Sequence, residues 1–150
     1  MSEEDIDFKS IIERTNLKGR CDVIDNFILD VSHNPASVKN LISFVAKNYK
    51  DTKFSAIFSS MNDKDNVSII KEISHLIDEW NICSISDDRF DTESLTELTE
   101  SLTQTKINKL NTVYSAVERG YHEGTPQIVF GSFITVSEAY KALEKLKSQL

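Results

Sequence analysis

At 150 residues, the chain has the length of one ordinary domain. Its 17 basic and 24 acidic side chains give a net charge of -7, which argues against nucleic acid or an anionic membrane as a main partner, because both attract clustered lysine and arginine. No apolar run approaches a membrane span, and the two cysteines have no metal or C-x-x-C spacing. We therefore expect a cytoplasmic protein with reduced cysteines.

The first part of the chain is expected to be a linker followed by a pair of strands. Residues 1–18 show only weak apolar periodicity, so we expect a linker or frayed segment there and place the domain at residues 19–150. Between Arg20 and Leu29, two short apolar runs flank the turn-forming pair Asp25-Asn26.

The second of these runs leads into the most informative loop of the sequence, which reads Asp30-Val31-Ser32-His33-Asn34-Pro35. Asn34 can cap a helix and Pro35 suits the first helical turn, so a helix is expected directly after the loop. Asp30 and His33 then lie between the carboxyl end of a strand and the amino end of a helix. Anions and other ligands commonly bind at such junctions in α/β sheets.

From this loop onward, strand and helix patterns alternate. Short apolar runs predict strands, and apolar residues three or four positions apart predict helices. The expected strands are Phe54–Phe58, Ile82–Ile85, Lys106–Leu110 and Gln127–Phe130. Five helices are expected. The first follows Pro35, the second carries Ile69, Ile70, Ile73, Leu76 and Ile77 on one side, the third spans Thr92–Leu102, the fourth is capped by Asn111, and the fifth includes Val136, Tyr140 and Leu146.

This alternation predicts an α/β fold, a Rossmann-like and mostly parallel sheet with helices on both faces, whose first strand is antiparallel. The four glycines lie at positions 19, 120, 124 and 131, and they match neither standard phosphate-binding glycine motif. No serine lies in a nucleophile-elbow motif. Catalysis by this chain alone is therefore not expected.

Polar residues follow several of the predicted strands. Asp30 with His33, the run Asn62-Asp63-Lys64-Asp65, and Ser132 should converge, because parallel strands end at one edge of a sheet. Arg20 would reach this edge from the antiparallel strand. Arginine, carboxylate and lysine side chains together suit a nucleotide.

Each candidate also has a purely structural explanation. Asp30 and Asp65 could stabilise helix N-termini, and His33 could be an ordinary loop histidine. Arg89 has aspartates beside it and could form a surface ion pair.

Four segments in order resemble one known family. They are Gly19-Arg20, Leu29 to Pro35, Met61 to Asp65, and the ending Gly131-Ser132-Phe133-Ile134-Thr135-Val136. Together they resemble the C-terminal domain of the bacterial bifunctional dihydrofolate synthase/folylpolyglutamate synthase, a member of the Mur ligase superfamily. The D-x-[AS]-H-N-P loop is typical of the superfamily, whereas the G-S-F-x-T-V ending favours the folate branch.

The resemblance implies a function shared with an N-terminal P-loop domain of the same polypeptide. That domain carries the P-loop and binds most of the Mg²⁺, and the C-terminal domain closes over ATP. Such enzymes join L-glutamate to dihydropteroate or folate through an acyl phosphate. By resemblance, Arg20 and Asp30 are expected to contact ATP, and His33 and Ser132 to contact glutamate. Contacts to phosphate or at domain closure are expected from Asn34, Lys64, Asp65 and Arg89. No metal ligand is expected in this part of the enzyme.

Two positions depart from the family, since Asn62 and Ile134 stand where histidine is frequent. Two alternatives therefore stay open. The chain could belong to another Mur-type amino-acid ligase, or it could be a stand-alone Rossmann-like binding module.

Overall fold

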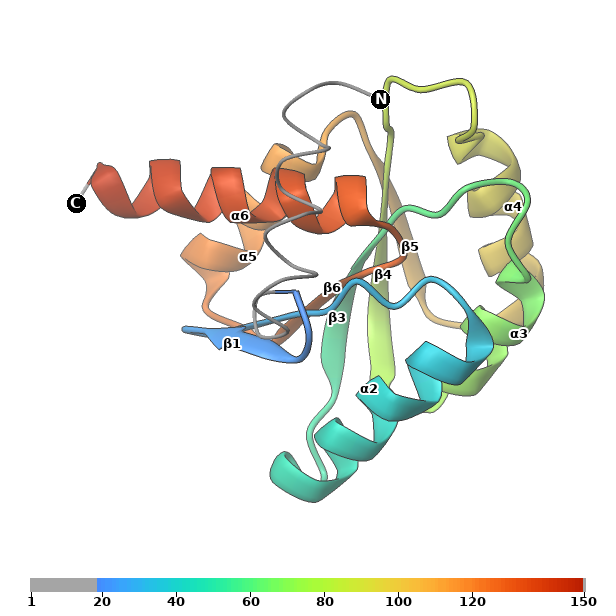
Figure 1. Ribbon diagram of the computed structural model, residues 1–150, viewed down its shortest axis with the longest axis horizontal. Helices are drawn as coiled ribbons and strands as arrows, with labels where there is room; N and C mark the ends of the chain where they lie inside the picture. The colour runs from blue at the N-terminus through green and yellow to red at the C-terminus, as the bar shows by residue number, and fades with distance from the viewer. Residues whose placement is uncertain (1–18, 150) are drawn as a thin grey trace.

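The computed structural model describes residues 19–149, so the expected linker at residues 1–18 lies outside the described part (Figure 1). Residues 19–149 form a six-stranded sheet in the order β1-β2-β6-β3-β4-β5. The strands are β1 (Asp22–Ile24), β2 (Phe27–Leu29), β3 (Phe54–Phe58), β4 (Ile77–Cys83), β5 (Lys106–Leu110) and β6 (Gln127–Phe130). The helices are α2 (Pro35–Asn48), α3 (Asn66–Ile73), the 3-10 turn η1 (Ser74–Leu76), α4 (Thr92–Leu102), α5 (Val113–Glu123) and α6 (Phe133–Ser148).

The strand directions confirm the predicted fold class. β1 pairs antiparallel with β2, and the remaining neighbours pair in parallel. The last strand, β6, lies between β2 and β3, and its Ile128 pairs with Ile28 on one side and Ala56 on the other. The order of the sheet therefore reverses beside β6, which is where ligands bind in open α/β sheets.

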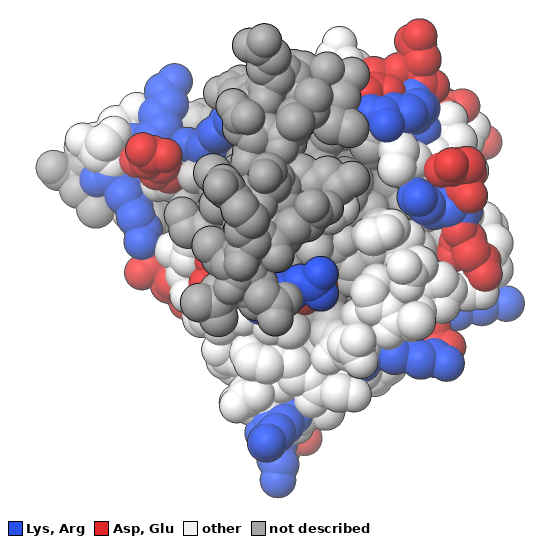
Figure 2. Space-filling view, viewed as in Figure 1, with Lys and Arg blue, Asp and Glu red and all other residues white. Residues whose placement is uncertain are grey.

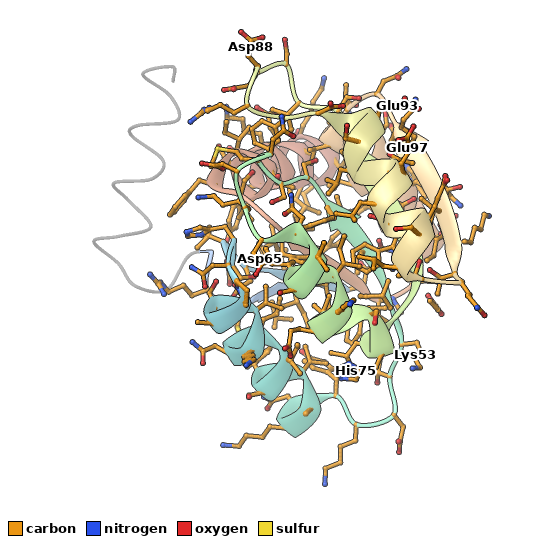
Figure 3. All side chains as sticks on the ribbon, turned by 90° about the vertical axis from the view of Figure 1, so that its right-hand side faces the viewer. Lys53, Asp65, His75, Asp88, Glu93 and Glu97 are labelled. Atoms are coloured by element: carbon orange, nitrogen blue, oxygen red, sulfur yellow. The ribbon has the colours of Figure 1, made fainter. Side chains whose placement is uncertain are left out.

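Helices cover both faces of the sheet (Figure 1). One apolar core joins the sheet to α2, α3 and α4, which lie side by side in Figure 3. At its centre, the rings of Phe58 and Phe130 stack, and the Trp80 ring packs edge-on against Phe58. The opposite core joins the sheet to α5 and α6 through residues such as Leu29, Val129 and Leu143. Successive strand residues alternate between the two cores, so the central strands are buried on both faces and look continuously apolar in sequence.

The prediction for residues 66–85 was wrong at one boundary. The expected helix through Leu76 and Ile77 ends at Ile73, and the expected strand Ile82–Ile85 is instead the seven-residue β4, which begins at Ile77. Leu76 and Ile77 continue the helical spacing of the preceding isoleucines. Pairing of Ile77 with Phe54 of β3 overrides that local preference. Trp80 consequently lies in the middle of a strand and is fully buried.

Two helix starts test the capping predictions. Asn34 caps α2, as predicted, and forms a reciprocal capping box with Ser37, while Pro35 lies in the first turn. The predicted cap of α5 at Asn111 was one residue early, because Thr112 accepts the hydrogen bond from the Ser115 amide. Among the described helices, none is long and apolar enough to cross a membrane.

Gly131 fixes how β6 leaves the sheet. Its φ of +115° is unfavourable for residues with a side chain, and an added Cβ would lie 2.2 Å from the Ser59 carbonyl oxygen. The Gly131 amide donates to the Ser32 carbonyl oxygen at 2.9 Å. Because both neighbours are backbone atoms, only glycine permits this approach between the ends of β2, β6 and β3.

We predict that Gly131→Ala destabilises the fold by at least about 3 kcal/mol, since backbone strain and a steric clash add. Gly124→Ala is the matched control. Gly124 also has a positive φ, of +73°, but nothing lies within 4 Å of an added Cβ, so its cost should be only about 1–2 kcal/mol. Urea unfolding followed by circular dichroism measures both changes. Equal losses in the two variants would disprove the close-packing argument.

Candidate functional site at the strand ends

Hydrogen bonds between loops hold the carboxyl ends of neighbouring strands together. The Gly131 amide donates to the Ser32 carbonyl oxygen, and Thr135 Oγ1 donates to the Ser59 carbonyl oxygen at 3.1 Å. The next link runs from the Asn62 amide to the Arg89 carbonyl oxygen at 2.8 Å. These contacts join the loops after β2, β6, β3 and β4 into one continuous edge, which confirms the predicted convergence.

Asp30 is a buried carboxylate that organises the start of this edge. Its Oδ2 accepts from the Cys21 amide at 2.9 Å and from Cys21 Sγ at 3.3 Å, and its Oδ1 accepts from the Ser32 amide at 2.8 Å. A carboxylate has about four acceptor positions, so Oδ1 retains one for a ligand hydroxyl. Asp30 thus has a structural role that leaves a ligand contact available.

Arg20 precedes Cys21, the partner of Asp30, in the turn before β1, and its side chain is exposed. Cys21 lies in the same turn, one residue before the strand, and its φ is +50°. Burial, reinforced by the Asp30 carboxylate, raises the pKa of the Cys21 thiol to about 12. Both cysteines are free thiols, and burial alone raises the pKa of Cys83 to about 12, in agreement with the expected reduced state.

His33 is held in one orientation. Its Nδ1 lies 3.0 Å from the Val31 carbonyl oxygen, and since a carbonyl can only accept, Nδ1 carries the hydrogen. In the neutral ring with this tautomer, Nε2 is a hydrogen-bond acceptor. The imidazole also packs against Phe133, with ring centroids 6.0 Å apart. This contact places His33, at the start of α2, beside the start of α6.

The N-termini of α2 and α6 have uncharged caps. Asn34 caps α2, and the buried Ser132 caps α6 by accepting from the Thr135 amide at 3.0 Å. Neither helix has an acidic residue in its first turn. The positive ends of both helix dipoles are therefore not neutralised by a capping carboxylate. The surface over α2 is also largely uncharged, whereas charged side chains crowd the side where α3 and α4 lie (Figure 2).

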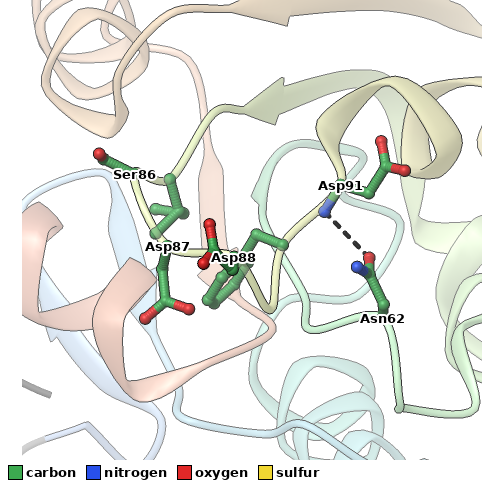
Figure 4. Close-up of a pocket in the computed structure, with 7 residues that line it drawn as sticks. Asn62, Ser86, Asp87, Asp88 and Asp91 are labelled. Atoms are coloured by element: carbon green, nitrogen blue, oxygen red, sulfur yellow. Dashed lines mark hydrogen bonds between the residues drawn. The ribbon is translucent and has the colours of Figure 1, made fainter.

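The other half of the edge is acidic. Asp65 caps α3 and Asp91 caps α4, so carboxylates already occupy these two N-termini. The loop after β4 forms an open hollow of about 620 Å³, lined by Asn62, Ile85, Ser86, Asp87, Asp88, Phe90 and Asp91 (Figure 4). Lys64 lines a second hollow, of about 240 Å³, between α3 and α4.

Arg89 and Asn62 have protein partners in this half. The Arg89 guanidinium donates to both oxygens of Asp87, at 2.9 and 2.7 Å, and these bonds hold the pKa of the Asp87 carboxyl well below its usual range. The ion pair anticipated from the sequence is thus present. Asn62 Oδ1 accepts from the Asp91 amide at 2.9 Å, so this departure from the family pattern ties two loops together. In the described part of the chain, no three potential ligands gather as a metal site.

Sequence reasoning missed one long-range partner of the site. Tyr140 was predicted only as part of the apolar face of α6, yet its hydroxyl accepts from the Gly19 amide at 2.8 Å and donates to Asp22. The one available signal was a hydroxyl within an otherwise apolar stripe.

Comparison with known proteins identifies this architecture. Residues 14–133 match the family described as Mur ligase, glutamate ligase domain. A dihydrofolate synthase/folylpolyglutamate synthase of Buchnera aphidicola subsp. Baizongia pistaciae is 31% identical over 144 residues, which cover 91% of this chain and 33% of that protein. The chain therefore spans about a third of the length of the curated relatives it matches.

Two solved structures have a domain of the same fold. The FolC protein of E. coli, in complex with DHPP and ADP, matches with a TM-score of 0.76 over 87% of this chain and 32% of that one, at 22% identity. A bifunctional folylpolyglutamate synthase/dihydrofolate synthase with Mn, AMPPNP and L-glutamate bound matches with a TM-score of 0.73 at 27% identity, over 85% of this chain and 32% of that chain. The predicted resemblance is confirmed.

We predict a loss of stability at alkaline pH that depends on Cys21. The thiol pKa rises from an ordinary value of 9.0 to about 12 on folding, so its contribution is complete below pH 9 and is lost as pH rises toward 12. Unfolding free energies measured between pH 7 and pH 11 should fall more steeply for the wild type than for Cys21→Ala. Parallel pH curves for the two proteins would contradict this.

Proposed function

Since the chain belongs to the family of Mur ligase, glutamate ligase domains, we propose that it is the C-terminal domain of an ATP-dependent carboxylate–amine ligase. The ligase joins L-glutamate to dihydropteroate, to a folate, or to both. In the proposed reaction, ATP converts the acceptor carboxylate to an acyl phosphate. The glutamate amine then attacks the acyl carbon, forms the amide and releases phosphate. Positioning of the substrates and neutralisation of phosphate charge supply most of such catalysis.

We assign the nucleotide side of the proposed site to Arg20 and Asp30. The exposed guanidinium of Arg20 can pair with a phosphate or stack on a purine. The remaining acceptor position on Asp30 Oδ1 suits a ribose hydroxyl.

The position of His33 between the starts of α2 and α6 is the main support for a glutamate site there. In the neutral His33 ring, Nε2 is an acceptor, which suits the glutamate amine. The two helix N-termini beside it have uncharged caps, so their positive dipole ends suit a carboxylate. Ser132 belongs to this part of the site and caps α6, whereas Asn34, which caps α2, keeps its assignment to phosphate or domain-closure contacts. The acidic half of the edge would repel glutamate, so the proposal is restricted to the loops after β2 and β6.

Contacts at domain closure are assigned to the loops after β3 and β4. Lys64 would neutralise phosphate, with Asp65 holding the start of its helix. For Arg89 to bind phosphate, its ion pair with Asp87 would have to break. Among residues 19–149, no three His, Cys, Asp or Glu side chains gather as a metal site. We assign Mg²⁺ to an N-terminal P-loop domain of the same polypeptide. The cytoplasmic location stays a prediction.

The names of the relatives favour folate over peptidoglycan precursors, since the curated matches include several dihydrofolate synthase/folylpolyglutamate synthases. One relative's structure contains AMPPNP and L-glutamate, the two ligand classes proposed for this chain.

Sequencing the DNA upstream of Met1 is the first test. An in-frame segment with a G-x-x-x-x-G-K-[ST] motif is expected. A stop codon there would favour the stand-alone binding module. The second test measures ADP release by the complete ligase with L-glutamate and dihydropteroate, tetrahydrofolate or a peptidoglycan precursor. Turnover only with the precursor would favour another Mur-type ligase.

For the complete ligase, we predict that Arg20→Ala raises the KM for ATP about tenfold or more, because a charged hydrogen bond contributes about 1.5–3 kcal/mol. Lys50→Ala is the control. It removes the same charge from an exposed turn at the opposite edge of the sheet, and it should leave the KM for ATP unchanged. Initial rates at varied ATP measure both. Unchanged kinetics in Arg20→Ala would remove this residue from the site.

We also predict that Ser132→Ala raises the KM for glutamate more than the KM for ATP. The variant loses a helix cap, which by itself costs about 1 kcal/mol of stability. Thr112→Ala removes the matching cap of α5, so it should lose similar stability without a change in the KM for glutamate. Initial rates and thermal unfolding of both variants separate the two effects. A larger effect of Ser132→Ala on ATP would reassign the residue.

A further inference from the structure

The hydroxyl of Tyr140 connects α6 to the turn that carries Arg20. The Gly19 amide donates to this hydroxyl at 2.8 Å, and the hydroxyl donates to the Asp22 carboxylate. The two partners lie 121 and 118 residues away in sequence and directly flank Arg20 and Cys21. One side chain of α6 therefore holds both ends of a four-residue turn.

The other side of the same turn is attached to the loop after β2. The Val31 amide donates to the Gly19 carbonyl oxygen at 2.7 Å, and the Cys21 amide donates to Asp30 Oδ2 at 2.9 Å. Gly19 and Cys21 both have positive φ angles, of 77° and 50°. For Cys21, which has a side chain, this conformation is unfavourable and persists only where surrounding contacts enforce it.

Tyrosine has the chemistry that this position needs. A neutral phenol accepts one hydrogen bond from an amide and donates another to a carboxylate at the same time. Burial and the bond to Asp22 raise the pKa of the Tyr140 phenol, so it stays neutral at physiological pH. Phenylalanine would keep the packing of the ring but form neither bond.

We propose that Tyr140 is a positioning residue for ATP, which holds the turn from Gly19 to Asp22 so that Arg20 is presented to the nucleotide. This inference rests on the proposed function of Arg20. Tyr140 acts through the turn and does not itself touch the substrate. Because Ser132 caps α6, the same helix connects the proposed glutamate side of the site to the proposed ATP side.

The test compares Tyr140→Phe with Tyr121→Phe in the complete ligase. Tyr121 is also partly buried, against the same apolar core, but it has no hydroxyl hydrogen bond within residues 19–149. We expect Tyr140→Phe to raise the KM for ATP roughly threefold to tenfold, less than Arg20→Ala does, because the bonds to Val31 and Asp30 still hold the turn. The kcat and the KM for glutamate should be unchanged. Tyr121→Phe should leave all three constants unchanged.

Two further measurements test whether the Tyr140 hydroxyl holds the turn and whether it acts through Arg20. Amide hydrogen exchange of the 150-residue chain should be faster at Gly19 in Tyr140→Phe than in the wild type. In the Arg20→Ala background, Tyr140→Phe should add little to the KM for ATP, because both substitutions act through one contact.

Three outcomes would overturn the proposal. Unchanged exchange at Gly19 would show that the hydroxyl does not hold the turn. Faster exchange with an unchanged KM for ATP, while Arg20→Ala raises that KM, would overturn the positioning role and leave the proposed function of Arg20 intact. An unchanged KM in both variants would overturn the assignment of Arg20 and the proposal together.

Discussion

The convergence of the strand-end loops depends on the position of β6 between β2 and β3. β6 is buried along its full length and pairs with a parallel strand on each side, so its end is fixed by two neighbours. The ring contact between His33 and Phe133 then follows, since β2 and β6 each lead directly into a helix. Gly131 is the steric condition for this insertion, because any side chain there would meet the backbone of the β3 loop. The proposed site is thus a consequence of strand order.

The choice of helix caps divides the edge of the sheet electrostatically. All five described helices that begin at this edge are capped by a polar side chain, but only α3 and α4 use aspartate. Asparagine or serine satisfies the same amide without cancelling the helix dipole. Three helices have neutral caps, at Asn34, Thr112 and Ser132, but only the starts of α2 and α6 are joined by the contact between His33 and Phe133. This division supports the placement of glutamate beside α2 and α6.

Local sequence patterns were sufficient for most elements and for the convergence of the strand-end loops. The Asn34-Pro35 pair and the turn at Asp25-Asn26 were predicted correctly because their determinants lie within a few residues. The boundary near Ile77 was not, because apolar spacing there fits a helix and only pairing with β3 decides otherwise. Likewise, no local pattern shows that Tyr140 meets Gly19, a contact that spans 121 residues.

Asp30 shows why a motif alone does not define a role. The sequence suggested two alternatives for this residue, a structural carboxylate or a ligand contact, and the geometry makes them compatible. Its backbone partners fix the Arg20 turn on one side and the loop of His33 on the other, while one acceptor position remains. Removing the carboxylate would therefore disturb both proposed subsites at once. The more selective probe of the nucleotide side is the Tyr140 hydroxyl, because its bonds reach only the turn from Gly19 to Asp22 among the described residues.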